Sequence, residues 1–257
     1  MNIKIIFEDN NLLVVNKPAH VIVNRADTAK GSLTLQDWVE EYSGVLKDVL
    51  SVQEKEKFMI NGYNKYDEFI SRSGIVHRLD KETSGIILIA KNVETFMKLQ
   101  EKFKTHDVVK TYLALVHGKL DSPEGEIKEP IGRLPWNRTR FGVLQEGRDA
   151  YTHYKVLEEK KYMGECLTLV EVHPKTGRTH QIRVHFQHIN HPIFADVLYA
   201  GRKTARNDRK VLSRHFLHAG RIEFTDVLSS KKVSYESPLP EDLTTFLNSL
   251  ESFQLNK

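Results

Sequence analysis

The chain has 257 residues, of which 40% are hydrophobic and 28% are charged, and its formal net charge is +4. A chain of this length and composition can bury about three quarters of its unfolded surface, which excludes a disordered protein. No stretch reaches the roughly 18 apolar residues of a membrane span, and the first residues lack the pattern of a signal peptide. The single cysteine, Cys166, excludes an internal disulfide and a cysteine-based zinc site, so we expect a cytoplasmic protein without a membrane anchor.

The predicted elements begin with strands. Residues 3–18 contain two β-branched runs joined by the turn-forming residues 9–11, a pattern typical of a hairpin. Ser32 and Asn92 are each expected to cap a helix, because apolar residues recur at helical spacing after both. A last helix is predicted after Pro240, since the fixed φ of proline suits a first helical turn.

Five apolar runs between these helices are predicted to be strands: residues 85–90, 111–118, 151–157, 166–173 and 216–224. Polar loops rather than regularly alternating helices connect them. This arrangement favours an α+β fold with a central mixed, largely antiparallel sheet flanked by helices and loops. No linker or repeat divides the chain, so residues 1–257 are expected to form a single domain. Residues 43–72 are charge-rich and are predicted to be a surface insertion.

Positive charge is concentrated in two segments. Residues 201–215 contain six basic residues and one acidic residue, and residues 133–148 contain four basic residues and one acidic residue, with Trp136 and Phe141 between them. Such loops suit contacts with phosphates and stacking on bases, although ordinary solvated loops have similar compositions. The candidate contacts to a nucleic-acid backbone are Arg133, Arg138, Arg140, Arg202, Lys203 and Arg206.

The first candidate site is the segment SGIVHRLDKETSGIILIA, residues 73–90, which places Asp80 in a tight polar turn between two apolar strands. Such a turn can present a carboxylate to a substrate while the strands hold it in place. Asp, Thr, Ser and Gly are also the residues that an ordinary turn requires, so composition alone leaves both interpretations open.

The second candidate site is the segment 173–192, where a glycine-containing loop leads into a helix with Ile182 on its apolar face. Arg183 lies beside that face and is expected to be partly buried. A buried guanidinium without a carboxylate partner is strongly destabilising, and Asp80 is the candidate partner.

Three histidines, His185, His188 and His191, raise the alternative of a metal site in this segment. On a helix the first two can share a face, but the third has rotated away, and no nearby acidic or cysteine side chain completes a ligand set. Solvated or packed histidines are therefore expected. Tyr112, in the apolar run of residues 109–120, is by composition alone a packing residue.

The motifs together resemble one known family. HRLDKETSG closely resembles the catalytic motif of the RluA-type pseudouridine synthases and places the family's aspartate at Asp80. KTYLALVHG resembles the second signature, whose tyrosine falls on Tyr112, and TGRTHQIRVH resembles the third, with its arginine at Arg183 and its apolar pocket residue at Ile182. Weaker matches extend the resemblance over residues 5–225, and three motifs in the family's order argue against chance.

Two features depart from the family pattern. His20 and Asn24 stand where the family usually shows a glycine and a histidine. Many relatives also carry an S4 RNA-binding domain ahead of the first strand, and this chain is expected to lack one. Substrate choice should then depend on the chain's own loops, among them the predicted insertion at 43–72.

The resemblance implies a pseudouridine synthase fold with an active-site cleft, and an isomerase that detaches uracil from ribose and rejoins it through carbon without a metal or cofactor. Asp80 would attack C1′ of the sugar or C6 of the ring, and Arg183 would keep it ionised and oriented. Tyr112 would stack on the detached uracil and help to remove the C5 proton, while Arg78 would fill the place of the flipped base. The expected substrate-binding residues are His77, Arg78, Arg178, Gln181 and Ile182.

The implied partner is a stem-loop of ribosomal or transfer RNA, bound by a monomer. Two other functions stay open. An RNA-binding protein that has lost turnover would have no need of Asp80, Tyr112 and Arg183 together. Hydrolysis of nucleosides or a metal-dependent nuclease would require further acidic residues, and water where the resemblance implies an apolar pocket.

Overall fold

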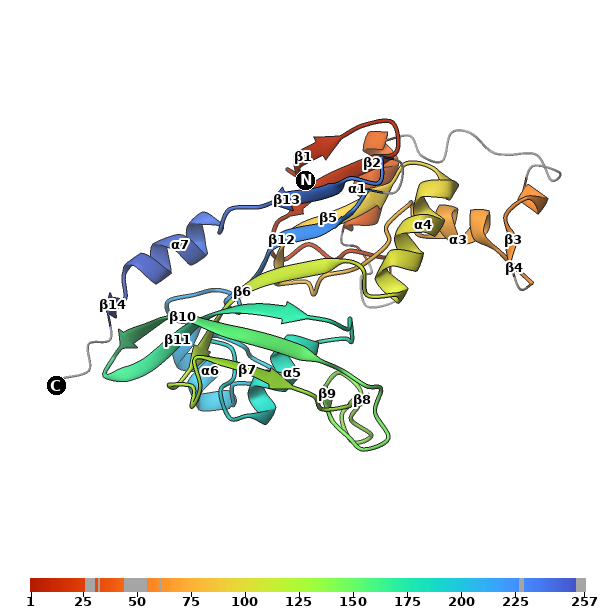
Figure 1. Ribbon diagram of the computed structural model, residues 1–257. Coiled ribbons are helices and arrows are strands. Elements are labelled where there is room, and N and C mark those ends of the chain that lie inside the picture. Colours follow the sequence, from red (N-terminus) through yellow and green to blue (C-terminus); the bar gives the residue numbers. More distant parts are fainter. Residues whose placement is uncertain (26–30, 32, 44–54, 61, 227–228, 253–257) are drawn as a thin grey trace. The chain divides into compact units, whose positions relative to one another are not determined.

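Figure 1 shows the computed structural model of the chain, which describes residues 1–25, 31, 33–43, 55–60, 62–226 and 229–252. Its strands form a mixed, largely antiparallel sheet flanked by helices, which confirms the predicted α+β fold class. The chain divides into two compact units, residues 1–108 with 222–237 and residues 109–221 with 238–257. Strand β12 (Leu217–Thr225) crosses this division after Arg221, so it supplies residues to both units.

The strands of the first unit begin with the predicted hairpin, β1 (Lys4–Glu8) and β2 (Leu12–Lys17). The carboxylate of Asp9 closes its turn by accepting hydrogen bonds from the N–H groups of Asn11 and Leu12, both at 2.7 Å. β2 pairs antiparallel with β5 (Ser84–Ala90), whose other neighbour is β12. β13 (Lys232–Glu236) pairs with β12 in turn.

Helices α1 (Leu35–Ser43) and α4 (Val93–Lys104) form where the apolar spacing predicts them. Asn92 caps α4 as expected, because its side chain accepts a hydrogen bond from the N–H of Thr95 at 2.9 Å. The fully buried Phe96 and Leu99 pack α4 into the core of the first unit with the residues of β5. The expected cap of α1, Ser32, lies outside the described residues.

The predicted insertion at 43–72 is described only in part, since residues 44–54 and 61 lie outside the described residues. β3 (Met59–Ile60) and β4 (Tyr63–Asn64) form a short hairpin that leads into α3 (Lys65–Ser71). Tyr66 and Phe69 of α3 are buried in the core of the first unit. The C-terminal part of this segment is therefore core rather than surface, and its two turns of helix are too short to show a clear apolar period.

In the second unit the strand order is β12, β6 (Val109–His117), β11 (Glu165–Pro174), β10 (Thr152–Tyr162) and β14 (Glu251–Ser252), and β7 (Glu124–Ile127) also pairs with β10. β10 and β11 form a long hairpin whose two-residue turn, Met163 and Gly164, has positive φ at both positions, 49° and 87°. Such a turn matches the twist of paired strands.

The helices of the second unit are α5 (Gln181–His188), α6 (Arg202–Asp208) and α7 (Glu241–Asn248). α5 and α7 are predicted by the sequence, whereas α6 lies inside the basic segment 201–215, whose composition predicts a loop. β8 (Ile131–Arg133) and β9 (Phe141–Val143) form a separate hairpin. Of the helices described, none is long and apolar enough to cross a membrane.

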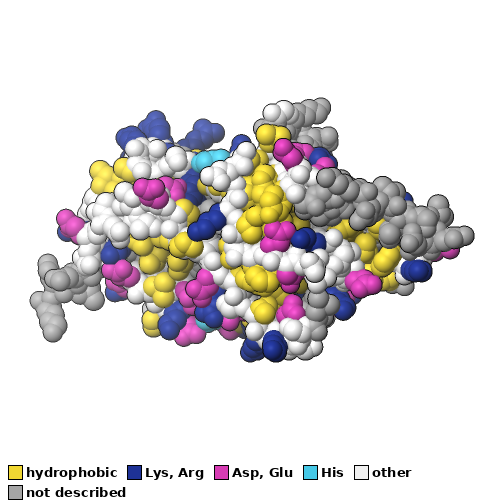
Figure 2. All heavy atoms as spheres, turned by 90° about the horizontal axis from the view of Figure 1, so that it is seen from above, with side chains coloured by type: hydrophobic (Ala, Val, Ile, Leu, Met, Phe, Trp, Pro, Cys, Tyr) yellow, Lys and Arg dark blue, Asp and Glu magenta, His cyan; other side chains and the backbone are white. Residues whose placement is uncertain are grey.

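Figure 2 shows positive and negative side chains interspersed over most of the face that it draws.

Candidate active site

Asp80 ends an extended segment that is held against β5. Ile75 forms an antiparallel bridge with Ile89, and Nε2 of His77 accepts a hydrogen bond from the N–H of Leu88 at 2.9 Å. The carbonyl oxygen of Asp80 accepts a hydrogen bond from the N–H of Thr83 at 3.2 Å, which closes the predicted turn before β5 begins. Residues upstream of the turn therefore form one β-bridge, at Ile75, instead of the predicted strand.

The predicted substrate contacts of this segment differ in exposure. The ring of His77 stacks on Phe103 at 4.8 Å between centroids, in addition to its hydrogen bond with the backbone of β5. These contacts give His77 a part in holding the Asp80 turn. Arg78 is exposed and Asp80 is half-buried. The turn therefore presents both side chains at the surface of the first unit, as a site for a large substrate requires.

Lys17, at the end of β2, supports the same turn from inside the first unit. Its side chain is fully buried, and Nζ donates to the carbonyl oxygens of Pro18, Val21 and Lys81 at 2.9, 3.0 and 3.2 Å. Because a buried ammonium must be hydrogen-bonded, these contacts fix the backbone directly after Asp80. His20 has φ 68°, a left-handed conformation that favours glycine, which accounts for the glycine usual in the family at this place.

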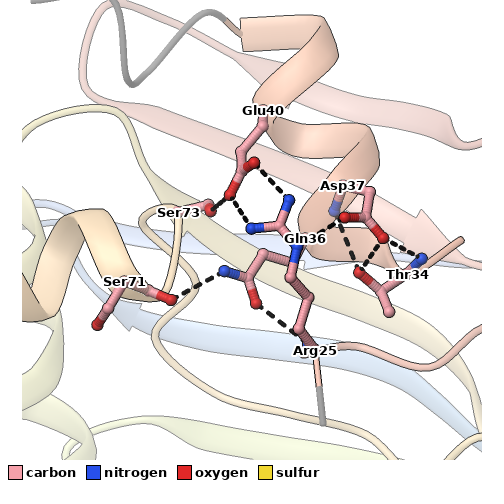
Figure 3. Close-up of polar contacts among 7 residues, drawn as sticks. All are labelled: Arg25, Thr34, Gln36, Asp37, Glu40, Ser71 and Ser73. Atoms are coloured by element: carbon pink, nitrogen blue, oxygen red, sulfur yellow. Dashed lines mark hydrogen bonds and ion pairs between the residues drawn. The ribbon is translucent and has the colours of Figure 1, made fainter. Parts of the chain in front are cut away.

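A polar network anchors the start of the segment to α1 (Figure 3). Gln36 donates to the carbonyl oxygen of Ser71 at 2.8 Å, and the hydroxyl of Ser73 donates to Glu40 at 2.5 Å. Arg25 bridges Glu40 and Asp37. Burial alone would raise the pKa of Glu40, but the hydrogen bonds from Arg25 and Ser73 outweigh it and lower that pKa. The carboxylate is therefore ionised at neutral pH and holds Ser73 against α1.

Tyr112 and Ile182 share one apolar cluster of the second unit. Tyr112 lies on β6 opposite Val172 of β11, and it packs half-buried against a cluster that contains the buried residues Ile182, Val172 and Phe186. This packing agrees with the role that composition alone suggests for Tyr112, and the apolar pocket that the motifs imply stays a prediction.

Gln181 begins α5 and organises the loop before it. Its side-chain oxygen accepts from the hydroxyl of Thr176 at 2.6 Å and from the N–H of Arg178 at 3.0 Å, while its amide nitrogen donates to Tyr151 and Thr152, both at 3.0 Å. This buried amide is thus engaged in structural contacts. Arg178 is half-buried, and its pKa is lowered by burial and by the nearby Arg148, so two positive charges lie close together at this loop.

Arg183 is buried as predicted, with 5% of the residue exposed. Its Nε and Nη2 donate to the two carboxylate oxygens of Asp196 at 2.7 and 2.9 Å. Asp196 is fully buried and also accepts from the N–H groups of Leu198 and Tyr199 at 2.9 and 3.2 Å. Asp196 is thus a bidentate partner of the guanidinium that the sequence pattern did not predict, and the pairing of Arg183 with Asp80 stays a prediction. An aspartate inside the apolar run IFADVLYA was the signal that could have indicated this partner.

Two of the three histidines considered for a metal site, His185 and His191, have other contacts. Both ring nitrogens of the buried His185 lie 2.9 Å from oxygen atoms, Nδ1 from the hydroxyl of Thr152 and Nε2 from the carbonyl of Glu129. Burial lowers the pKa of His185, which favours a neutral ring that donates to Glu129. The ring of His191 contacts the carbonyl oxygen of His117 at 2.8 Å. Within the described ranges no three His, Cys, Asp or Glu side chains are grouped so as to hold a metal.

The two basic segments are exposed only in part. Arg209 donates to the carbonyl oxygen of Ala195 at 2.7 Å, and the buried Arg214 forms an ion pair with Asp242 of α7 at 2.6 Å, so both have structural roles. Arg140 is half-buried over the ring of Tyr199. The candidate RNA contacts that are exposed are Arg133, Arg138, Arg202, Lys203 and Arg206.

Lys110, the first residue of the motif KTYLALVHG, is a titratable group to which the motifs assign no role. It lies two residues before Tyr112 on the same face of β6, its Nζ donates to the carbonyl oxygen of Thr176 at 3.2 Å, and burial lowers its pKa to about 8. Between pH 8 and about 10.4, folded Lys110 has released its proton, whereas a lysine of the unfolded chain, with a pKa of about 10.4, still holds it. The free energy of unfolding should therefore rise with pH over this range.

We expect the wild-type free energy of unfolding to rise by about 2 kcal/mol relative to that of Lys110→Met between pH 8 and pH 10. Equilibrium urea unfolding of both proteins across this range measures the difference, and tyrosine and cysteine titrations common to both proteins cancel. A difference that stays constant with pH would show that the ammonium is well solvated.

The sequence matches the family model described as RNA pseudouridylate synthase over residues 11–188. The chain therefore belongs to the RNA pseudouridylate synthases, a family of isomerases, and the RluA-type resemblance of its motifs is confirmed.

Its similarity extends to individual proteins. A ribosomal large subunit pseudouridine synthase D of Nitrosomonas europaea is 37% identical, and the match covers 97% of this chain and 66% of that protein. An RNA pseudouridine synthase of Bacillus subtilis named YlyB is 36% identical, with coverage of 97% and 73%. The chain thus spans about two thirds to three quarters of the length of these relatives. The solved structure of Human RNA Pseudouridylate Synthase Domain Containing 1 matches with a TM-score of 0.71 at 26% identity, and covers 100% of this chain and 91% of that one.

Proposed function

We propose that this chain converts specific uridines of ribosomal RNA to pseudouridine, with Asp80 as the nucleophile. The observation that carries the proposal is the Asp80 turn, a half-buried carboxylate whose backbone is fixed by Thr83, by the buried Lys17 and by the His77 contact with β5. Ribosomal RNA is favoured over transfer RNA because the relatives named synthase D act on the ribosomal large subunit by their names. Such a substrate is consistent with a cytoplasmic enzyme.

The proposed chemistry divides between the two units, which would act as one catalytic domain. In one route Asp80 adds to C1′ of the ribose as the bond to N1 breaks, and it is released when C5 bonds to C1′. In the other route Asp80 adds to C6 of the uracil, the bond of C1′ passes from N1 to C5, and the carboxylate leaves C6 as the C5 proton is lost. Tyr112 lies against the freed uracil and assists removal of the C5 proton, and Arg183 orients the Asp80 carboxylate. The packing of Tyr112 against the apolar cluster that contains Ile182 supports this assignment, because apolar surroundings would exclude the water that hydrolyses the intermediate.

The RNA would be held by the exposed basic residues of the β8–β9 hairpin and of α6. Arg133 and Arg138 flank the exposed Trp136 on the hairpin, so phosphate contacts and base stacking are available together. The target uridine must leave its stack to reach Asp80, which costs a few kcal/mol, and Arg78 would occupy the vacated place.

The experiment that tests the function is to incubate the purified protein with total RNA from a strain that lacks the gene. New pseudouridines are then mapped by carbodiimide treatment and primer extension, with ribosomal and transfer RNA fractions read separately. A new site in ribosomal RNA is the expected result. A site in transfer RNA alone would retain the isomerase and change its substrate, whereas tight RNA binding without any new site would indicate an RNA-binding protein without turnover.

Tyr112→Phe should leave RNA affinity unchanged and slow product formation at saturating enzyme by about 100-fold, since a proton-transfer group contributes about this much. The ring, and with it the packing against the apolar cluster that contains Ile182, is kept. Single-turnover assays and filter binding separate the two effects. An unchanged rate would show that the hydroxyl takes no part in removing the C5 proton.

A further inference from the structure

Tyr199 is a buried side chain, 4% exposed, in the segment that follows Asp196. Its hydroxyl accepts a hydrogen bond from the N–H of Phe141 at 3.1 Å and lies 2.8 Å from Nδ1 of His180. Phe141 is the first residue of β9, and His180 directly precedes α5 with a left-handed φ of 57°. One hydroxyl therefore joins the β8–β9 hairpin to the start of α5.

The ring of Tyr199 contacts a positively charged side chain from each of the same two elements, the β8–β9 hairpin and α5. The guanidinium carbons of Arg140 and Arg183 lie 5.2 and 5.1 Å from the ring centroid, which is the distance of a cation–π interaction. Asp196 also holds Arg183, and the N–H of Tyr199 donates to that carboxylate. Asp196 and Tyr199 thus both contact the guanidinium of Arg183, and they are hydrogen-bonded to each other.

The hairpin that Tyr199 holds carries the most exposed aromatic residue of the basic segments. Trp136 is 77% exposed in the loop between β8 and β9, and Arg133 and Arg138 of the same hairpin are exposed. Arg133 is fixed in turn, because its guanidinium donates to the carbonyl oxygen of Arg138 at 3.1 Å and lies over the ring of Phe141. A hairpin of this size has little core of its own, so its position depends on anchors such as Tyr199.

We propose that Tyr199 is a positioning residue with two separable parts: its hydroxyl holds the β8–β9 hairpin where it binds RNA, and its ring holds Arg183 where it serves catalysis. The inference rests on the proposed function, since it takes Arg183 to be the arginine of the site and the hairpin to contact RNA. The hydroxyl acts on binding of the substrate, whereas the ring acts on the reaction of bound substrate.

A plain packing role is the alternative, because Tyr199 also belongs to a small buried cluster with Ile131, Ala150 and Val184. Loss of packing would lower thermal stability and reduce binding and rate in parallel in every variant. The two parts are separated by comparing Tyr199→Phe, which removes only the hydroxyl, with Tyr199→Leu, which removes the ring as well. Tyr162→Phe is the matched control, because Tyr162 packs on Phe194 and Phe246 elsewhere in the second unit.

Filter binding to a ribosomal RNA fragment and single-turnover rates at saturating enzyme are the measurements. We expect Tyr199→Phe to weaken RNA binding about five- to tenfold, the effect of one buried hydrogen bond, with the saturated rate within twofold of wild type. Tyr199→Leu should weaken binding similarly and also slow the saturated rate by at least about fivefold, the effect of a lost cation–π contact. Tyr162→Phe should change neither.

A second background tests whether the hydroxyl acts through the hairpin. When Trp136→Ala and Arg138→Ala are already present, adding Tyr199→Phe should change the RNA affinity by less than twofold, because the group it positions has gone. The inference would be overturned if Tyr199→Phe weakened RNA affinity in this background as much as it does in the wild-type protein. It would also be overturned if Tyr199→Phe alone reduced RNA affinity and the saturated rate equally. Product formation by wild type and Tyr162→Phe shows that the proposed function holds in either case. If neither forms product, the proposed function fails and the assignment of the ring falls with it, while the binding data still decide the assignment of the hydroxyl.

Discussion

Asp80→Asn should reduce pseudouridine formation by about 10⁴-fold or more, while fold and RNA affinity stay close to those of the wild type. The substitution removes the nucleophilic charge without changing the volume of the side chain. The Asp80 turn is closed by the carbonyl oxygen of residue 80, which asparagine retains, and asparagine is itself a turn residue. Single-turnover assays on ribosomal RNA, with circular dichroism melting in parallel, measure both properties.

Asp121→Asn is the control for this variant, because it removes an exposed carboxylate that belongs to no part of the proposed site. It should retain the wild-type rate. Turnover by Asp80→Asn within tenfold of wild type would remove Asp80 from the role of nucleophile. A large loss of stability in Asp80→Asn would mean instead that the carboxylate is needed to compensate a buried charge.

Asp196→Ala should lower the free energy of unfolding by about 3–5 kcal/mol, because it leaves the guanidinium of Arg183 buried without its bidentate partner. The N–H groups of Leu198 and Tyr199 would lose their acceptor as well. Equilibrium urea unfolding at neutral pH measures the change, and Asp121→Ala, at an exposed position, should change stability by less than about 0.5 kcal/mol.

The double variant Arg183→Met with Asp196→Leu separates the cost of a stranded charge from the value of the ion pair. Replacing both charges with apolar groups should recover most of the lost stability, although activity would be absent. If Asp196→Ala alone costs less than about 1 kcal/mol, a second carboxylate also compensates Arg183, and Asp80 is the candidate that the sequence predicts.

Much of the fold was predictable because local patterns decide it. The hairpin of β1 and β2, the cap of α4 at Asn92 and the apolar face of α5 each follow from residues within a few positions of one another. α3 and α6 are short helices, too brief for an apolar period to emerge. The hairpin of β8 and β9 was missed because its strands have three residues each.

Less of the candidate site than of the fold could be predicted from local sequence patterns. The resemblance of the motifs, rather than composition, indicated Asp80, Tyr112 and Arg183. Asp196 could be recognised only as a charged residue inside an apolar run, because it lies thirteen residues from Arg183 and no local pattern specifies which carboxylate meets a buried guanidinium. Nor does a local pattern specify the contact of Lys17 with the carbonyl oxygen of Lys81, which joins residues 64 positions apart.

The division of β12 between the two units delays folding of the first unit during synthesis on the ribosome. β5 has β2 and β12 as its neighbours, and Ile222 and Phe224 of β12 belong to the core of the first unit. A nascent chain therefore carries an open β5 edge and an incomplete core until residues more than a hundred positions later have left the ribosome. Open strand edges invite pairing with other chains, so the first unit passes through synthesis in a state that chaperones would recognise.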